Sequence, residues 1–311
     1  MMDNKSLYIV EAAFPLLGAL EAISYYNTNN FRLVIRLSTK ENEKQLIKIV
    51  EDLNIDTNNI TFMGGYGYGE VFKKLSEFKF LLWLFFNKNK YTKYFLGDYH
   101  SRYLTLLRKL CLKNKKVIYL DDGSSTIRAN NSFSRDRFFD WFTIYELTAL
   151  PKQSIVQHDF PYIRGKIKQK VLDKSNKTII IGDKFYEAGL LSQKDSNKIL
   201  EKLMDRLEGE DVIYMAHRGE SIEKLESIRK KYDIDVIKND FPIELYGLYA
   251  EKLPKRVVSF FSTALYSLKK IYPEIEVKLY RIDTTMFTDH VKAYDNAYKA
   301  YEPYMEIIDL T

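Results

Sequence analysis

The stretch from Val212 to Ser221, Val-Ile-Tyr-Met-Ala-His-Arg-Gly-Glu-Ser, combines the features that decide the fold class of this chain. Its apolar start is typical of a buried strand. Gly219 then breaks the apolar pattern, and the charged residues that follow open a helical segment. A histidine between a strand and a helix N-terminus lies where α/β folds bind ligands, and imidazole exchanges protons near neutral pH. His217 is therefore a candidate site residue, although a solvated turn histidine has the same pattern.

Strands and helices alternate on both sides of this stretch. We expect strands at 7–10, 31–37, 60–63, 93–96, 116–120, 178–181, 212–215, 235–237, 257–261 and 276–280. Helical segments lie between most of them, and this order builds parallel sheets with helices on both faces. Residues 134–162 are irregular and aromatic, and 166–177 are rich in lysine. The sequence thus predicts an N-terminal lobe, 1–155, a linker, 156–177, and a C-terminal lobe, 178–311, with a cleft between the lobes.

The composition is that of an ordinary globular protein. The chain has 311 residues, 46% hydrophobic and 29% charged, which is enough for two domains with separate cores. A net charge of +6 suits nucleotides, anionic sugars, a membrane surface or nucleic acid without choosing among them. The single cysteine, Cys111, excludes an internal disulfide. The N-terminus lacks a secretory signal pattern, and the apolar run 80–86 is too short to span a bilayer, so we expect a cytoplasmic protein.

Three polar motifs follow predicted strands: Asp121-Asp122, His217 and Ser262-Thr263. In an open parallel sheet the carboxyl ends of all strands face the same crevice. A carboxylate can act as a base, an imidazole as an acid, and hydroxyls at a helix start can hold phosphate. Such a set suits group transfer to a hydroxyl. Each motif also has a structural alternative, because acid pairs and Ser-Thr pairs commonly cap helices.

Together these motifs resemble those of the bacterial sialyltransferases of the capsule and lipooligosaccharide type. That family carries an acidic-acidic-Gly motif, a His-Pro motif and a Ser/Thr pair, in this order. Here Asp121-Asp122-Gly123 matches the first, His217-Arg218-Gly219-Glu220 is similar to the second, and Ser262-Thr263 matches the third. Arg218 stands where proline is usual. Pro242-Ile243-Glu244 resembles the ribose-binding segment of the family, and Phe14–Leu17 resembles its beginning, so the likeness spans residues 7–270.

The resemblance implies a GT-B fold and an inverting transfer from a CMP-activated nonulosonic acid, usually a sialic acid. The acceptor would be a hydroxyl of a glycan such as a galactose-terminated one, in surface polysaccharide or lipooligosaccharide synthesis, with no metal or other cofactor. Asp121 or Asp122 would be the base, with Asp121 favoured, and His217 would stabilise or protonate the leaving phosphate. The implied donor-binding residues are Gly182, Arg218, Glu220, Glu244, Ser262 and Thr263. The implied acceptor-binding residues are Pro15, Leu16, Asp98 and Gly123.

Two other classes of function remain open from the residues alone. Asp121-Asp122 could bind a divalent metal in a UDP-hexose transferase, although the pair lacks the spaced Asp-x-Asp form. A basic, tyrosine-rich nucleic-acid-binding protein is the other class, but the lysines are scattered and no such motif occurs, so we expect no nucleic-acid partner.

The aromatic and basic segment 71–86 is a helix whose apolar side chains we expect mainly in the core. The alternative is a weak membrane contact through Phe72, Lys73, Lys74, Lys79 and Trp83. No oligomeric state follows from the sequence.

Overall fold

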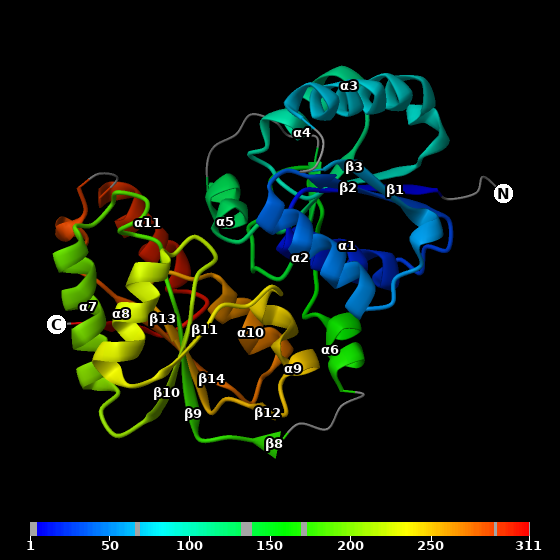
Figure 1. Ribbon diagram of the computed structural model, residues 1–311. Helices are drawn as coiled ribbons and strands as arrows, with labels where there is room; N and C mark the ends of the chain where they lie inside the picture. The colour runs from blue at the N-terminus through cyan, green and yellow to red at the C-terminus, as the bar shows by residue number, and fades with distance from the viewer. Residues whose placement is uncertain (1–4, 66–68, 132–138, 169–172, 289–290, 311) are drawn as a thin grey trace. The chain divides into compact units, whose positions relative to one another are not determined.

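A computed structural model describes residues 5–65, 69–131, 139–168, 173–288 and 291–310 (Figure 1). The chain divides into two compact units. The N-terminal unit comprises Met1–Lys166 with Asp240–Pro242, and the C-terminal unit comprises Ile167–Asn239 with Ile243–Thr311.

The N-terminal unit is built on a parallel sheet of seven strands in the order β3-β2-β1-β4-β5-β6-β7. Its strands are β1 (Ser6–Val10), β2 (Phe31–Leu37), β3 (Ile60–Gly64), β4 (Lys93–Leu96), β5 (Val117–Leu120), β6 (Phe139–Thr143) and β7 (Ile155–Gln157). Its helices are α1 (Ala13–Tyr25), α2 (Lys40–Asp52), α3 (Glu70–Asn87), α4 (Arg102–Cys111), α5 (Ser124–Asn131) and α6 (Pro161–Ile167), with 3-10 turns at Thr57–Asn59 and Lys88–Lys90. Helix α1 packs beside α2, and α3 beside α4, and Figure 1 shows the two pairs on opposite faces of the sheet.

The C-terminal unit repeats this design with a parallel sheet of six strands, in the order β11-β10-β9-β13-β14-β15. Its strands are β9 (Lys177–Ile181), β10 (Asp211–Met215), β11 (Asp235–Ile237), β13 (Arg256–Ser259), β14 (Glu276–Arg281) and β15 (Ile307–Asp309). Two short strands, β8 (Asp173–Lys174) and β12 (Lys252–Leu253), pair separately. The helices are α7 (Gln193–Arg206), α8 (Ile222–Tyr232), α9 (Tyr246–Tyr249), α10 (Ala264–Ile271) and α11 (Val291–Tyr301), with 3-10 turns at Ile243–Leu245 and Thr284–Met286.

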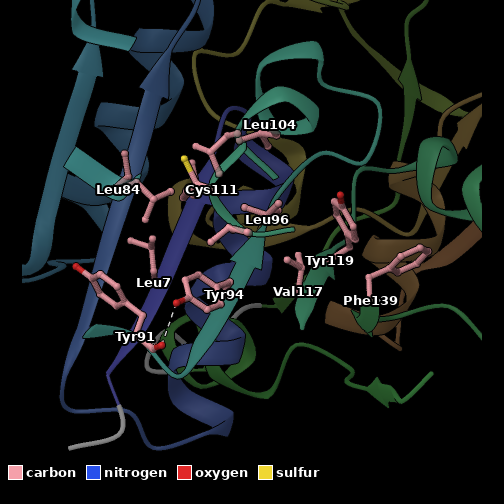
Figure 2. Close-up of a cluster of buried hydrophobic side chains, with 14 of the residues drawn as sticks. Leu7, Leu84, Tyr91, Tyr94, Leu96, Leu104, Cys111, Val117, Tyr119 and Phe139 are labelled. Carbon is pink, nitrogen blue, oxygen red and sulfur yellow. Dashed lines mark hydrogen bonds between the residues drawn. The ribbon is translucent and has the colours of Figure 1, made fainter. Parts of the chain in front are cut away.

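The strands are apolar because helices cover both faces of each sheet. In β1 the residues from Leu7 to Val10 are all fully buried. Figure 2 shows one half of this core, where Leu84 of α3 and Leu104 of α4 gather around Leu96 of β4. The Tyr94 hydroxyl in the same cluster donates a hydrogen bond of 2.9 Å to the Tyr91 carbonyl. Tyr94 thus enters this core with its hydroxyl satisfied.

A long-range contact anchors the last helix of the N-terminal unit. Glu21 of α1 is almost completely buried, and its carboxylate accepts hydrogen bonds from the backbone N–H groups of Tyr162 (3.0 Å) and Ile163 (2.7 Å) at the start of α6. The first N–H groups of a helix have no partner inside the helix, so this carboxylate satisfies two of them. Burial raises the pKa of Glu21 to about 7, against the effect of these two bonds.

The structure differs from the sequence interpretation at several places. Residues 134–162, expected to be irregular, contain β6 and β7, and β15 follows Pro303 where no strand was predicted. These strands are short, and each mixes polar with apolar residues, so they carry little periodic signal. The range 156–177 contains α6 and β8, and the two units divide after Lys166. Helix α1 begins at Ala13 rather than at Leu16, with Pro15 in its first turn.

Candidate active site

Three adjacent strands of the C-terminal unit end at the predicted donor residues. Strand β9 lies between β10 and β13, and Met215, Ile181 and Ser259 are in register across the three strands. His217 follows β10 by two residues, Gly182 directly follows β9, and Ser262-Thr263 follow β13. Because all three strands are parallel, the structure brings these segments to one edge of the sheet.

The His217 ring is neutral and has a defined tautomer. Its Nδ1 accepts a hydrogen bond of 3.0 Å from the backbone N–H of Gly219, so the proton of the neutral ring is on Nε2. Burial, together with the positive charges of Lys184 and Arg218, lowers the pKa of His217 to about 4. The ring therefore presents an uncharged N–H donor among cations. An anion bound beside it would raise its pKa, because negative charge favours the imidazolium form.

Glu220 supports the loop that carries His217 from the interior of the unit. Its carboxylate is completely buried and accepts hydrogen bonds from the Tyr214 hydroxyl (2.7 Å) and from the backbone N–H of His217 (2.6 Å). Lys224 of α8 completes the arrangement with an ion pair of 2.8 Å. Burial raises the pKa of Glu220, and the nearby Lys224 opposes the rise. The structure thus turns Glu220 toward the protein interior, whereas the sequence interpretation gave it a donor contact.

Lys224 extends the arrangement into a buried polar network. Its ammonium donates a hydrogen bond of 3.0 Å to the Asp183 carbonyl and lies 3.9 Å from carboxylate oxygens of Asp183 and Glu187. Glu187 in turn accepts a hydrogen bond of 3.1 Å from the backbone N–H of Ser221, the N-cap of α8. The network therefore connects the end of β9 with the start of α8.

Gly182 is required here by close packing. A Cβ atom at this position would lie 2.7 Å from the Tyr214 hydroxyl oxygen and would also collide with the Glu220 carboxylate. The backbone N–H of Gly182 donates a hydrogen bond of 2.8 Å to the Met215 carbonyl. The predicted donor-binding glycine is thus explained by its neighbours in the fold.

Ser262 and Thr263 lie at the start of α10 and are both half-buried. The Ser262 hydroxyl accepts a hydrogen bond of 3.2 Å from the backbone N–H of Ala264. Thr263 occupies the N-cap position, and its side chain makes no capping bond. Hydroxyls at the start of a helix suit an anion, because the N–H groups there carry partial positive charge. Arg218, on the neighbouring loop, is exposed.

Glu244 lies against the same helix. Its carboxylate is buried and accepts a hydrogen bond of 2.7 Å from the Ser267 hydroxyl of α10, and burial raises its pKa. The Tyr272 hydroxyl donates a further bond of 2.9 Å to the Glu244 carbonyl. Helix α10 therefore joins the predicted ribose residue to the predicted phosphate residues.

In the N-terminal unit the acid pair divides into an inner and an outer member. Asp121 is buried, and its two carboxylate oxygens accept hydrogen bonds from the Thr143 hydroxyl (2.6 Å) and the Ile144 N–H (2.7 Å). Burial raises the pKa of Asp121 to about 7, although both bonds oppose the rise. Asp122 is only half-buried. Gly123 follows with a φ of 54°, in the left-handed region that favours glycine. Asp121 thus ties β5 to the end of β6, and Asp122 is the more accessible carboxylate.

The predicted acceptor residues have unequal environments. Pro15 and Leu16 are buried in α1, and Leu16 has no exposed surface. Pro15 closely approaches Gly97, where a Cβ atom would lie 2.7 Å from the proline Cβ. Asp98 stays half-exposed after β4 and accepts a hydrogen bond of 2.7 Å from the His100 N–H. Of these residues, Asp98 and Gly123 lie at the carboxyl edge of the sheet with exposed surface.

Glu11 is a further residue at this edge that the sequence interpretation did not select. It follows β1, and its carboxylate accepts hydrogen bonds of 3.0 and 3.1 Å from the Ser101 hydroxyl. Arg36 pairs with it at 3.1 Å and with Glu77 at 2.7 Å. The strand β1 lies beside β4, so Glu11 and Asp98 follow neighbouring strands. The sequence signal that could have selected Glu11 is its position directly after a predicted strand.

Among the residues that the structure describes, no group of three or more His, Cys, Asp and Glu side chains has a geometry that could hold a metal ion.

Comparisons with known proteins agree with this architecture. Residues 143–281 match the family described as Alpha-2,8-polysialyltransferase (POLYST). This range includes His217, Glu244 and Ser262-Thr263 and excludes Asp121-Asp122. A sequence comparison with curated proteins gave no match.

Several solved structures share the fold at low sequence identity. The UDP-N-acetylglucosamine 2-epimerase from Rickettsia bellii is 15% identical, with a TM-score of 0.59 over 88% of this chain and 78% of that protein. A putative UDP-N-acetylglucosamine 2-epimerase from Listeria monocytogenes is 11% identical, with a TM-score of 0.56 over 90% and 79%. The Methanocaldococcus jannaschii UDP-GlcNAc 2-epimerase, solved with UDP-GlcNAc and UDP, is 13% identical, with a TM-score of 0.53 over 96% and 92%. The fold is thus of the GT-B type, and the family match supports a bacterial sialyltransferase.

Proposed function

We propose that the protein is an inverting sialyltransferase that uses a CMP-activated sialic acid, or a related nonulosonic acid, and a hydroxyl of an acceptor glycan. The observation that carries this proposal is the polysialyltransferase family match over 143–281, the range in which His217 and Ser262-Thr263 follow two strands that flank β9. The product would belong to a surface polysaccharide or lipooligosaccharide.

In this proposal the C-terminal unit binds CMP. The Ser262 and Thr263 hydroxyls and the start of α10 hold the phosphate, and Glu244 accepts hydrogen bonds from the ribose. The Nε2–H of His217 donates to a phosphate oxygen, with the charges of Arg218 and Lys184 nearby. The negative phosphate raises the pKa of His217 from its low value, so the ring can protonate the phosphate as the bond to the sugar breaks.

The N-terminal unit supplies the base. We assign this role to Asp122 rather than to Asp121, because both carboxylate oxygens of Asp121 already accept hydrogen bonds inside the fold. Asp122 takes the proton of the acceptor hydroxyl, whose oxygen forms the new bond to the anomeric carbon. The bond from that carbon to the CMP phosphate oxygen breaks, and CMP leaves with the electron pair. Attack on the face opposite CMP inverts the anomeric centre, through an oxocarbenium-like transition state.

Two acceptor classes follow from different observations. The motif resemblance favours a galactose-terminated glycan, and the description of the matched family favours a sialic-acid-terminated chain that is extended through α-2,8 linkages. Both use the same donor and the same base, so the acceptor alone distinguishes them.

A nucleotide panel tests the donor assignment. We expect CMP to raise the melting temperature more than UMP, UDP or GDP, and a nucleotide at 100 times its Kd stabilises the folded protein by about 2.7 kcal/mol. CMP-sialic acid is then supplied with a lactoside and with an oligosialyl lactoside, and mass spectrometry identifies the products. A larger shift with UDP, or turnover of a UDP-hexose alone, would favour the UDP-hexose transferase. Tight, salt-sensitive binding of an oligonucleotide without nucleotide-sugar turnover would favour the nucleic-acid-binding class.

A further inference from the structure

Helix α3 carries an unusually apolar exposed face. Its exposed large hydrophobic residues include Val71, Phe78 and Phe86, which have 82%, 57% and 78% of their surface open to solvent. The whole set on this helix is Val71, Phe72, Leu75, Phe78, Leu82, Phe85 and Phe86. Leu106 and Leu110 are also exposed on α4, which packs beside α3 (Figure 1). We call these nine residues the α3 face.

The helical spacing makes the α3 face continuous. Residues 71, 75, 78, 82 and 85 are separated by four, three, four and three positions, so they form one stripe along a helix. The opposite side of α3 buries Phe80 and Leu84 in the core of the N-terminal unit. Trp83, which the sequence analysis names in the alternative membrane contact, packs on Phe80 and on the guanidinium of Arg32. The helix is therefore apolar on two sides, and only one of them is covered by its own sheet.

Positive charge is concentrated in the segment that carries this face. Residues 70–116 contain twelve lysines and arginines and three acids, a net charge of +9, whereas the whole chain carries +6. The remaining residues therefore sum to −3. One of the three acids, Glu70 at the start of α3, lies 3.9 Å from the ammonium of Lys74. Lys74 and Lys79 are exposed on α3 on either side of the stripe, and Lys88 lies 4.4 Å from the ring centre of Phe85 at the end of the helix. Apolar stripes flanked by lysines are typical of helices that lie in a membrane interface.

We propose that the α3 face docks on an anionic lipid bilayer, with α3 parallel to the membrane surface. The phenylalanine and leucine side chains enter the boundary between head groups and acyl chains, and the flanking lysines contact lipid phosphates. No helix among the described residues is long and apolar enough to cross a membrane. A second copy of this chain is a poorer occupant, because it would bring two segments of +9 against each other. The proposal goes beyond the proposed function, since neither the nucleotide nor the acceptor needs these residues.

Vesicle flotation of the full chain tests this docking without any turnover. We expect binding to phosphatidylcholine vesicles that contain phosphatidylglycerol and little binding to phosphatidylcholine alone. Raising the salt from about 0.05 to about 0.5 M shortens the screening length from roughly 14 to 4 Å and should weaken the binding several-fold. The triple variant Phe78→Ser/Phe85→Ser/Phe86→Ser should lose at least about tenfold in vesicle affinity, because each removed ring takes apolar area out of the interface. Lys74→Glu/Lys79→Glu should lose the preference for anionic vesicles.

A matched control comes from the other unit. Ile222 of α8 has 66% of its surface exposed, and Ile222→Ser should bind vesicles as the unchanged protein does. Circular dichroism and the melting temperature show whether each variant stays folded, and the single change Leu82→Ser repeats the test with a smaller perturbation. Equal vesicle binding by the triple variant would overturn the proposal, as would no binding of the unchanged protein at low salt. A concentration-dependent dimer that the triple change dissociates, without vesicle binding, would assign the face to a second copy instead.

Discussion

Replacing Glu220 with glutamine removes the charge that supports the histidine loop while keeping the shape of the side chain. The buried carboxylate faces three donors, the Tyr214 hydroxyl, the His217 N–H and the Lys224 ammonium, at 2.6 to 2.8 Å. A glutamine amide must point its NH2 group at one of these donors. Breaking a buried ion pair costs about 3–5 kcal/mol. Lys224 keeps the more distant carboxylates of Asp183 and Glu187, so we expect about 3 kcal/mol, the lower end of that range.

That loss is measurable by calorimetry and by urea unfolding. For a unit of this size, 1 kcal/mol lowers the melting temperature by about 4 °C, so Glu220→Gln should lower it by roughly 12 °C. Turnover should fall more than CMP affinity, because the Ser262 and Thr263 hydroxyls are not attached to Glu220. The matched control is Glu226→Gln, at an exposed position on α8, the helix that begins just after Glu220, and it should change neither quantity. A melting temperature of Glu220→Gln equal to that of the unchanged protein would refute the role of this carboxylate.

Four further predictions address the acid pair, the packing of the donor loop, pH and metals. Asp122→Asn should lower kcat by about 100- to 10,000-fold and keep CMP affinity, whereas Asp121→Asn should keep most of the turnover. Steady-state kinetics and CMP titration measure both effects, and the reverse pattern would identify Asp121 as the base. Gly182→Ala should destabilise the protein by about 1–3 kcal/mol in urea, because its Cβ would collide with Tyr214, and Gly165→Ala, with open space around it, is the control that should not. The pKa of Asp121 is about 7 in the fold against 3.8 in the reference state, so its contribution to stability is complete below about pH 4 and is lost as the pH rises through 7. A pH series of urea unfolding should show this fall, and Asp121→Asn should flatten it. EDTA should leave turnover unchanged, and restoration of lost activity by magnesium or manganese would indicate a metal-dependent transferase.

The sequence predicts the parallel sheets well and the direction of individual side chains poorly. Strands such as Leu7–Val10 are continuous apolar runs because helices bury both of their faces. Strands β7 and β15 have three residues each, too few to show a period, and their pairing depends on the strands beside them. The family resemblance also selects Gly182, directly after a strand, and Glu220, at the opening of a helical segment. It could not show that Tyr214 packs closely on Gly182, or that the Glu220 carboxylate turns into the fold toward Tyr214 and Lys224.

The acid pair shows the same limit. Successive residues of an extended segment point to opposite sides, so the sequence predicts that Asp121 and Asp122 differ. The choice between them depends on Thr143 and Ile144, more than twenty residues later. Thr143 ends β6, a strand that the sequence analysis does not predict, and Ile144 directly follows it. Helix α3 is similar, because its apolar residues surround the helix and only the packed sheet shows which side is covered.

The bond between Glu21 and the start of α6 bears on how the chain folds as it is synthesised. The carboxylate emerges from the ribosome about 140 residues before its partners, Tyr162 and Ile163. Until those residues appear, this buried carboxylate lacks both of its N–H donors. Contacts between such distant residues form slowly, because a long loop has to close first. The N-terminal unit therefore stays incomplete until those residues have left the ribosome, and a chain truncated before residue 160 should be far more sensitive to protease than one truncated after residue 170.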